Sequence, residues 1–279
     1  MNDRKPICSV IVPAYNETAV IGRLLTALTD HDAPIEVIVV CNGCADDTAD
    51  RARATHPGVR VVEIPTPSKT AAINRGLREA EADITIIADA DVVLTGSGAI
   101  ALASEASKPG VTVVQPRVIY ATDHAQSLVR AHLRAWRRNP YNETRVSYAY
   151  ALSPAGRADL GTFPDVIADD EYVRRQLFDG AVWTDAASVR VFPPATLRAL
   201  VRTRSRALRG ARLMTREGRL PPPAPVASFW PRWTRMLASP AAVDALVYAA
   251  VTVAARWRAR RYALVERWAR DETTREARL

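Results

Sequence analysis

The stretch Ser9-Val-Ile-Val-Pro-Ala-Tyr-Asn-Glu17 decides the fold of this 279-residue chain. A short apolar, β-branched segment, typical of a buried strand, leads directly into a polar loop. A helix is expected next, with Thr18 as its N-cap. Its apolar face is formed by Ile21, Leu24, Leu25 and Leu28, which recur at helical spacing.

The same alternation continues through the first half of the chain. Strands are predicted at 35–40, 59–64 and 84–88, and helices at 47–55 and 71–82. Strands that alternate with helices pair in parallel through right-handed crossovers, which predicts a doubly wound α/β sheet. Ligands of such sheets bind beyond the carboxyl ends of the strands. Here those ends carry polar segments, at 13–17, 42–46 and 89–91.

The composition fits a globular protein with an anionic partner. Hydrophobic residues make up 48% and charged residues 24%, and 38 Lys+Arg against 30 Asp+Glu give a net charge of +8. A basic surface suits nucleotide phosphates, anionic lipids or nucleic acid alike. An Arg-dense segment at 198–219 holds eight of the arginines.

The three cysteines argue against a disulfide framework and for a reducing compartment. Cys41 and Cys44 form a CxxC pair without a second pair or clustered histidines, so a loop at a strand end is favoured over a metal or redox site. No secretory signal is evident, and the apolar run at 241–255 is short and interrupted by Asp244. We expect a cytoplasmic protein, either free or peripheral on the inner membrane face.

Four sets of residues could carry chemistry. Asp89 and Asp91 at a strand end can hold Mg²⁺ or Mn²⁺ together with substrate phosphates, or form a solvated turn. Lys69, beside a helix N-terminus, can meet phosphate or lie on the surface. The acidic run 169–171 can supply a general base or simply begin a helix. The loop 13–17 lacks a GxGxxG motif but can bind a ribose or base, or form a turn.

Taken together, five segments resemble the family 2 glycosyltransferases with the GT-A fold. Order and spacing agree over roughly the first 210 residues. The segments are Val10-Ile-Val-Pro-Ala-Tyr-Asn-Glu17, Val40-Cys-Asn-Gly-Cys-Ala-Asp-Asp-Thr48, Lys69-Thr-Ala-Ala-Ile-Asn-Arg-Gly76, Ala88-Asp-Ala-Asp91 and Phe163-Pro-Asp-Val-Ile-Ala-Asp-Asp170.

The resemblance assigns roles to individual residues. Asp170 would be the catalytic base, and Asp89 and Asp91 the metal ligands. Asn42 stands where many members have an Asp that reads the base, which leaves the base preference open. Lys69 would lie near the donor. The nucleoside pocket would be lined by Pro13, Tyr15 and Glu17, and a basic loop closing over the donor diphosphate would contain Arg202, Arg204, Arg206, Arg209 and Gly210, without the family's usual Trp.

The implied activity is an inverting transfer of a sugar from a UDP-, GDP- or dTDP-linked donor to an acceptor hydroxyl or amine. The acceptor, which is a glycan, a lipid carrier or a small natural product, is expected at the aromatic region 118–150, which includes Tyr148 and Tyr150. A sugar-phosphate nucleotidyltransferase is the alternative enzyme, but it usually carries a Gly-rich basic loop after strand one. A basic, non-catalytic module that binds membrane or nucleic acid is the third interpretation. We expect no nucleic acid, because no reading motif is present.

The expected organisation is a GT-A catalytic domain over 1–220 and a C-terminal extension. Residues 1–110 would bind the nucleotide sugar and 111–220 the acceptor. A Pro-rich linker and a helical tail would occupy 221–279, with Pro221–Pro225 stiff and extended. The tail, rich in Trp and Arg, either lies on a membrane surface or packs on the catalytic domain or at a homodimer interface.

Overall fold

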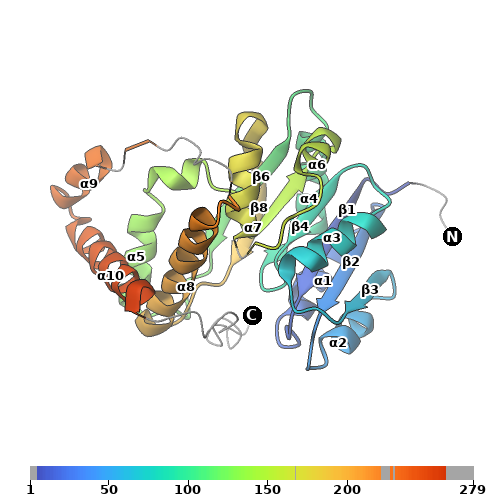
Figure 1. The fold of residues 1–279 in the computed structure, drawn as a ribbon, viewed down its shortest axis with the longest axis horizontal. Helices are drawn as coiled ribbons and strands as arrows, with labels where there is room; N and C mark the ends of the chain where they lie inside the picture. The colour runs from blue at the N-terminus through green and yellow to red at the C-terminus, as the bar shows by residue number, and fades with distance from the viewer. Residues whose placement is uncertain (1–4, 167, 221–226, 229, 262–279) are drawn as a thin grey trace. The chain divides into compact units, whose positions relative to one another are not determined.

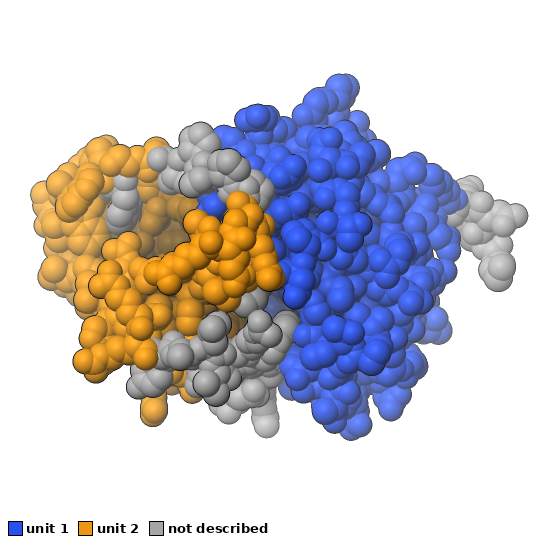
Figure 2. Space-filling model, in the orientation of Figure 1, with its two compact units in different colours: residues 1–119, 146–191 blue, residues 120–145, 192–279 orange. Residues whose placement is uncertain are grey.

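A computed structural model describes residues 5–166, 168–220, 227–228 and 230–261. The chain divides into two compact units, shown in different colours in Figure 2. Unit 1 comprises Met1–Ile119 and Val146–Val191, and unit 2 comprises Tyr120–Arg145 and Phe192–Leu279. Each unit is considered by itself. The predicted linker Pro221–Pro225 and the last 18 residues of the predicted tail lie outside the described residues.

Unit 1 contains an eight-stranded sheet in the order β3-β2-β1-β4-β7-β6-β8-β5. Figure 1 shows its neighbouring strands β1, β2 and β3 beside helix α3. Strands β1, β2, β3 and β4 pair in parallel, and β7 continues the sheet antiparallel to β4. The sheet is therefore mixed, and its parallel half confirms the predicted α/β architecture. The strands are β1 (Cys8–Ala14), β2 (Ile35–Asn42), β3 (Val59–Ile64), β4 (Thr85–Ala88), β5 (Val93–Leu94), β6 (Val113–Tyr120), β7 (Ala149–Leu152) and β8 (Ala181–Val191).

The helices of unit 1 flank this sheet, and α3 packs directly on β1 and β2. Helices α1, α2 and α3 begin close to the positions that the alternating pattern predicts, with small shifts at the ends. The helices are α1 (Ile21–Thr29), α2 (Thr48–Thr55), α3 (Lys69–Glu79), α4 (Gly96–Ala106), α6 (Pro154–Leu160), α7 (Asp169–Gln176) and the 3₁₀ turn η2 (Phe178–Gly180).

Strand β1 continues through Pro13, where the sequence pattern predicts its end. Pro13 and Ala14 extend the parallel register with β2, opposite Val40 and Cys41. The ladder between β1 and β4 stops earlier, at Ile11. A proline that lacks an N–H is tolerated here because only one neighbouring strand pairs with this end of β1.

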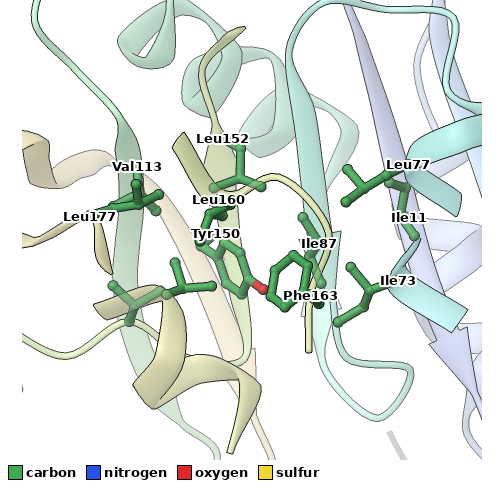
Figure 3. Packing of buried hydrophobic residues seen from close by; sticks show 12 residues of the cluster. Ile11, Ile73, Leu77, Ile87, Val113, Tyr150, Leu152, Leu160, Phe163 and Leu177 are labelled. Carbon is green, nitrogen blue, oxygen red and sulfur yellow. The ribbon is translucent and has the colours of Figure 1, made fainter. Parts of the chain in front are cut away.

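A buried hydrophobic cluster joins the sheet to α3 and α7 (Figure 3). Gly76 of α3 lies so close to Ile11 of β1 that a Cβ at this position would be 2.3 Å from Ile11 Cγ2. Glycine therefore allows the helix and the strand to approach closely. Besides Ile11, the cluster contains Ile73, Leu77, Ile87, Val113, Val146, Tyr150, Leu152, Leu160, Phe163, Val173 and Leu177.

Unit 2 is helical in the part that the structure describes, and its described helices beyond residue 220 confirm the predicted helical C-terminal extension. Its elements are α5 (Ser127–Trp136), the 3₁₀ turn η1 (Pro140–Glu143), α8 (Leu197–Arg216), α9 (Trp230–Leu237) and α10 (Ala242–Arg261). Helix α10 contacts α5, α8 and α9. None of the described helices is both long and apolar enough to cross a lipid bilayer.

The prediction of a basic loop at 202–210 is wrong, because the structure forms a helix there. These residues lie inside α8, which begins after Thr196, whose side chain accepts a hydrogen bond from Ala199 N. Arg204 stacks over the ring of Trp136 from α5, with its guanidinium carbon 4.3 Å from the ring centroid. Arg206 and Arg209 therefore belong to a packed helix of unit 2, because a capped, amphipathic pattern favours a helix over an open loop.

Candidate active site

The loops that follow β1 and β2 are tied together through Asn16. Its Oδ1 accepts a hydrogen bond from Ala45 N at 2.7 Å, and its backbone N donates to Cys44 Sγ at 3.3 Å. Glu17 N donates to Thr48 Oγ1 at 2.7 Å. Asn16 has a φ of 51°, in the left-handed region that Asn tolerates better than most residues. The two loops therefore hold each other at the carboxyl edge of the sheet.

This interlocking also explains why the predicted N-cap is wrong. Helix α1 begins at Ile21, and Val20 occupies the cap position without a side-chain hydrogen bond. Thr18 instead belongs to the loop, where its backbone N donates to Asp46 Oδ2 at 3.3 Å. Bonds between two loops thus replace the local cap that the sequence suggests.

The four residues expected to line a nucleoside pocket lie at these two strand ends. Pro13 and Asn42 are buried in β1 and β2, with Asn42 only 2% exposed. Tyr15 and Glu17 are partly exposed in the loop after β1. The structure therefore gathers these side chains at one edge of the sheet, with Tyr15 and Glu17 the more accessible pair.

Asp89 and Asp91 follow β4 directly, with Ala90 buried between them and both acids partly exposed. The backbone N of Asp89 donates to Tyr148 O at 2.7 Å. Tyr148 has a φ of 66°, which costs a bulky residue about 1–3 kcal/mol. A strained turn before β7 therefore positions the backbone of the Asp-Ala-Asp motif.

Lys69 joins the Asp-Ala-Asp motif to the acidic run at the start of α7. Its Nζ lies 2.7 Å from Asp89 Oδ1 and 2.9 Å from Asp169 Oδ2. Ser68 caps α3 by accepting a hydrogen bond from Ala71 N, which places Lys69 in the first helical turn. A cation is unfavourable at a helix N-terminus, so the two carboxylates compensate for its position.

Burial and charge act in opposite directions on this lysine. Burial lowers the pKa of Lys69, but Asp169 and Asp89 outweigh this effect and hold the pKa well above its ordinary value. The ammonium therefore stays charged. Burial, followed by the neighbouring charge of Asp169, raises the pKa of the Tyr150 phenol well above its ordinary value, so its hydroxyl stays protonated.

Tyr150 is 2% exposed, and its ring belongs to the hydrophobic cluster of Figure 3. Its hydroxyl has no hydrogen-bond partner among the described residues. The sequence predicts Tyr150 in an acceptor-binding region, whereas the structure places it in the core beside the charges of Lys69 and Asp169.

The three consecutive acids at the start of α7 have different surroundings. Asp169 is 4% exposed and contacts Lys69. Asp170 is partly exposed, and its Oδ1 accepts the backbone N–H of Glu171 at 2.8 Å. Glu171 pairs with two arginines of the same helix, Arg174 at 2.8 Å and Arg175 at 2.6 Å. The sequence left two interpretations of this acidic run open, a functional carboxylate or the start of a helix. Helix α7 does begin here, and a partly exposed carboxylate in its first turn is compatible with both interpretations.

Arg23 is a site residue that the sequence analysis missed. Its Nη2 donates to the backbone oxygen of Asp91 at 2.6 Å. Burial lowers the pKa of Arg23, while the Asp91 and Glu17 carboxylates act to raise it. No motif marks this arginine, because it is one polar position of an ordinary amphipathic helix. Its guanidinium links the metal motif to the loop after β1.

The residues present fit a magnesium or manganese ion shared with a substrate. Asp89 and Asp91 offer hard oxygen ligands beside a partly exposed edge, the donor type that these cations prefer. Among the described residues, no group of three or more His, Cys, Asp or Glu side chains could hold a metal alone. Mg²⁺ in such sites is usually bound by one or two carboxylates plus substrate phosphates. The donor set therefore suits a cation that binds together with a diphosphate.

The family model described as glycosyl transferase family 2 matches residues 9–156, and this chain belongs to that family. The chain is 30% identical over 106 residues to a 4,4'-diaponeurosporenoate glycosyltransferase from Staphylococcus aureus (strain USA300). That match covers 36% of this chain and only 28% of the relative, so the chain matches about a quarter of the relative's length.

Solved structures share the GT-A fold with this chain. One is the mannosyltransferase PcManGT from Pyrobaculum calidifontis, solved in complex with GDP-Man and Mn²⁺, with a TM-score of 0.58 and 24% identity over 94% of this chain and 77% of that chain. Another is the glucosyl-3-phosphoglycerate synthase of M. tuberculosis, with a TM-score of 0.52 and 23% identity over 77% of this chain and 81% of that chain.

Proposed function

We propose that this chain transfers a sugar from a nucleoside-diphosphate sugar to an acceptor hydroxyl or amine, with inversion at the anomeric carbon. The observation that carries the proposal is the double ion pair of Lys69 with Asp89 and Asp169. It brings the motif suited to a metal and a diphosphate into one site with the acidic run that can supply a base. In the proposed reaction the first assists departure of the diphosphate and the second accepts the acceptor's proton, and the family relationship supports that reaction class.

Asp170 is the better candidate for the base than Asp169. The carboxylate of Asp169 is buried, and its Oδ2 lies 2.9 Å from the Lys69 ammonium, so this side chain is already engaged in an ion pair. Asp170 is partly exposed and adjacent to it. In the proposed step Asp170 accepts the acceptor's proton. The freed oxygen or nitrogen attacks the anomeric carbon, and the bond from that carbon to the diphosphate oxygen breaks.

Asp89 and Asp91 would hold Mg²⁺ or Mn²⁺, which when bound neutralises charge on the departing diphosphate. Lys69 and Arg23 are the fixed cations at the same edge of the sheet, and each contacts one residue of the motif. We propose that Lys69 orients the Asp89 carboxylate, that Arg23 holds the backbone of Asp91, and that Tyr15 and Glu17 contact the nucleoside. The donor nucleotide would be UDP, GDP or dTDP. We also propose that a catalytic domain over 1–220 binds the nucleotide sugar through residues 1–110 and the acceptor through residues 111–220.

Calorimetric binding of UDP, GDP and dTDP, each with and without Mn²⁺, tests the donor site. We expect metal-dependent binding of one nucleotide and at least tenfold weaker binding by Asp91→Asn. Absence of binding by all three nucleotides in the presence of Mn²⁺ would overturn the proposal.

The base is tested once a donor is known. Asp170→Asn should keep donor affinity within about twofold and lower turnover by a factor of about 10² or more. Asp159→Asn is the matched control, since Asp159 is an exposed acid on α6. Normal turnover by Asp170→Asn would refute the assignment of the base.

A further inference from the structure

The charges of this chain are divided unequally between its two units. Residues 1–119 and 146–191 contain 15 basic and 22 acidic residues. Residues 120–145 and 192–261 contain 19 arginines and only four acidic residues. The net charge of +8 for the whole chain therefore combines an acidic unit 1 with a strongly basic unit 2. Such a field attracts an anionic partner to unit 2.

Exposed apolar side chains are concentrated in the same unit. Of the nine large hydrophobic residues that are exposed in the described part of the chain, seven belong to unit 2 and four to α10 alone. Single exposed apolar residues are ordinary on a protein surface, but a contiguous set marks an interaction site. The four on α10 are Val243 (64% exposed), Leu246 (60%), Val253 (66%) and Trp257 (53%).

These four residues lie along one face of α10. Their spacing of three, seven and four residues places them on a single stripe, and exposed Ala250 fills the gap. The opposite face packs inside unit 2 through buried Ala245, Tyr248, Val251 and Ala255. Helix α10 is therefore apolar on two faces, although only one of them is covered within unit 2.

The exposed face has no negative charge. The only acidic residue of α10 is Asp244, which is buried. Its carboxylate accepts two hydrogen bonds from Arg134 of α5, at 2.8 and 2.6 Å. Beyond Trp257 the helix ends in arginines, and Arg261 stacks over the Trp257 ring at 4.1 Å.

We propose that the α10 stripe, defined as Val243, Leu246, Ala250, Val253 and Trp257, docks unit 2 on the surface of an anionic lipid bilayer. An apolar helix face bordered by arginines and ending in Trp matches a lipid interface, where acyl chains, the headgroup boundary and anionic phosphates meet. Neighbouring arginines add electrostatic attraction to the lipids.

Charge also decides against two other occupants of the stripe. A second copy of the chain would place one strongly basic unit against another, which like-charge repulsion opposes. A nucleic acid would satisfy the arginines but would leave the aliphatic side chains of the stripe without apolar contacts. A bilayer satisfies both, and its binding does not depend on the proposed transferase activity.

Vesicle co-sedimentation of the full chain tests the proposal. We expect binding to vesicles of phosphatidylcholine with about 30% phosphatidylglycerol, weak binding to pure phosphatidylcholine, and weaker binding as NaCl rises from about 0.05 to 0.5 M. The double variant Leu246→Asp/Val253→Asp should bind at least tenfold more weakly. The control Ile7→Asp, at an apolar residue of unit 1 that is 43% exposed, should bind like the unchanged chain.

Three results would overturn the docking surface. One is no sedimentation with anionic vesicles at low salt. Another is anionic binding that Leu246→Asp/Val253→Asp leaves unchanged, because charge alone would then explain it. The third is a dimer, measured by analytical ultracentrifugation, that this variant dissociates while vesicle binding is absent. Circular dichroism verifies that the variant is folded.

Tryptophan fluorescence gives a second readout that does not rely on a destabilising charge. Anionic vesicles should shift the emission to shorter wavelength, and Trp257→Phe, which keeps an apolar ring, should remove a large part of that shift while still sedimenting. An unchanged shift in Trp257→Phe would contradict insertion of the stripe.

Discussion

The substitutions Lys69→Met and Lys5→Met each remove an ion pair with the same 2.7 Å distance. Comparing their effects on the free energy of unfolding shows how much the surroundings of each pair matter. Lys5 contacts Asp83 at 2.7 Å, with side chains 59% and 71% exposed. Lys69 contacts Asp89 at the same 2.7 Å, with side chains 32% and 28% exposed, and also contacts Asp169, whose side chain is 5% exposed. The two lysines therefore differ in solvent exposure and in the number of carboxylates they neutralise.

These exposures determine the expected cost of each substitution. An exposed pair contributes about 0–1 kcal/mol, because water screens it and ordering two side chains costs entropy. Removing one partner of a buried pair costs about 3–5 kcal/mol, because a buried charge is left uncompensated. Since Lys69 keeps about a third of its side-chain exposure, we expect Lys69→Met to cost about 3 kcal/mol.

Urea unfolding followed by circular dichroism measures both costs, and amide exchange of α3 and β4 confines the comparison to unit 1. Lys69→Met/Asp169→Asn should recover part of the loss, because the second change removes one uncompensated charge. Equal unfolding free energies for Lys69→Met and Lys5→Met, within about 0.5 kcal/mol, would refute the assignment of Lys69 as a partly buried link between Asp89 and Asp169.

Three further predictions concern single side chains. Gly76→Ala should destabilise unit 1 by about 1–3 kcal/mol in urea unfolding, because its Cβ would meet Ile11 at 2.3 Å, and an unchanged midpoint would contradict that approach. Tyr150→Phe should leave stability unchanged or slightly higher, since the lost hydroxyl has no partner among the described residues, and a loss above about 1 kcal/mol would show a missed bond. Burial lowers the pKa of His132 to about 3, below its unfolded value, so the unfolded state binds the proton as the pH falls below about 6.5. The unfolding free energy should therefore fall by about 2 kcal/mol from pH 7 to pH 5, and His132→Phe should lose that component; an identical pH dependence in the variant would refute it.

The parallel half of the sheet could be predicted because its signals are local. Each strand is a short apolar run, and each ends at a polar segment whose position at the sheet edge follows from parallel pairing. The placement of Asp89 and Asp91 directly after β4 follows from that rule. The contact of Lys69 with Asp169 does not follow from that rule, because it depends on where α7 begins relative to α3.

Two predictions failed for different physical reasons. Thr18 is a suitable N-cap by composition, but its backbone bonds to Asp46 of another loop, and the helix begins at Ile21 instead. The family resemblance predicts a loop at 202–210. The local sequence instead favours a helix, because Thr196 is a suitable N-cap and apolar residues recur after it at helical spacing. In the second case the local pattern favours the helix that the structure shows.

The division of charge explains why composition alone could not choose among anionic partners. The basic excess belongs to a unit formed from 120–145 and 192–261, segments that only the fold brings together. Unit 1, which contains the candidate site, is acidic overall and would repel a diphosphate. A donor that binds there needs local cations, and the described site supplies Lys69 and Arg23, both already engaged with the Asp-Ala-Asp motif. An added divalent cation is therefore the charge that the proposed donor site requires, which is why nucleotide binding should depend steeply on Mn²⁺.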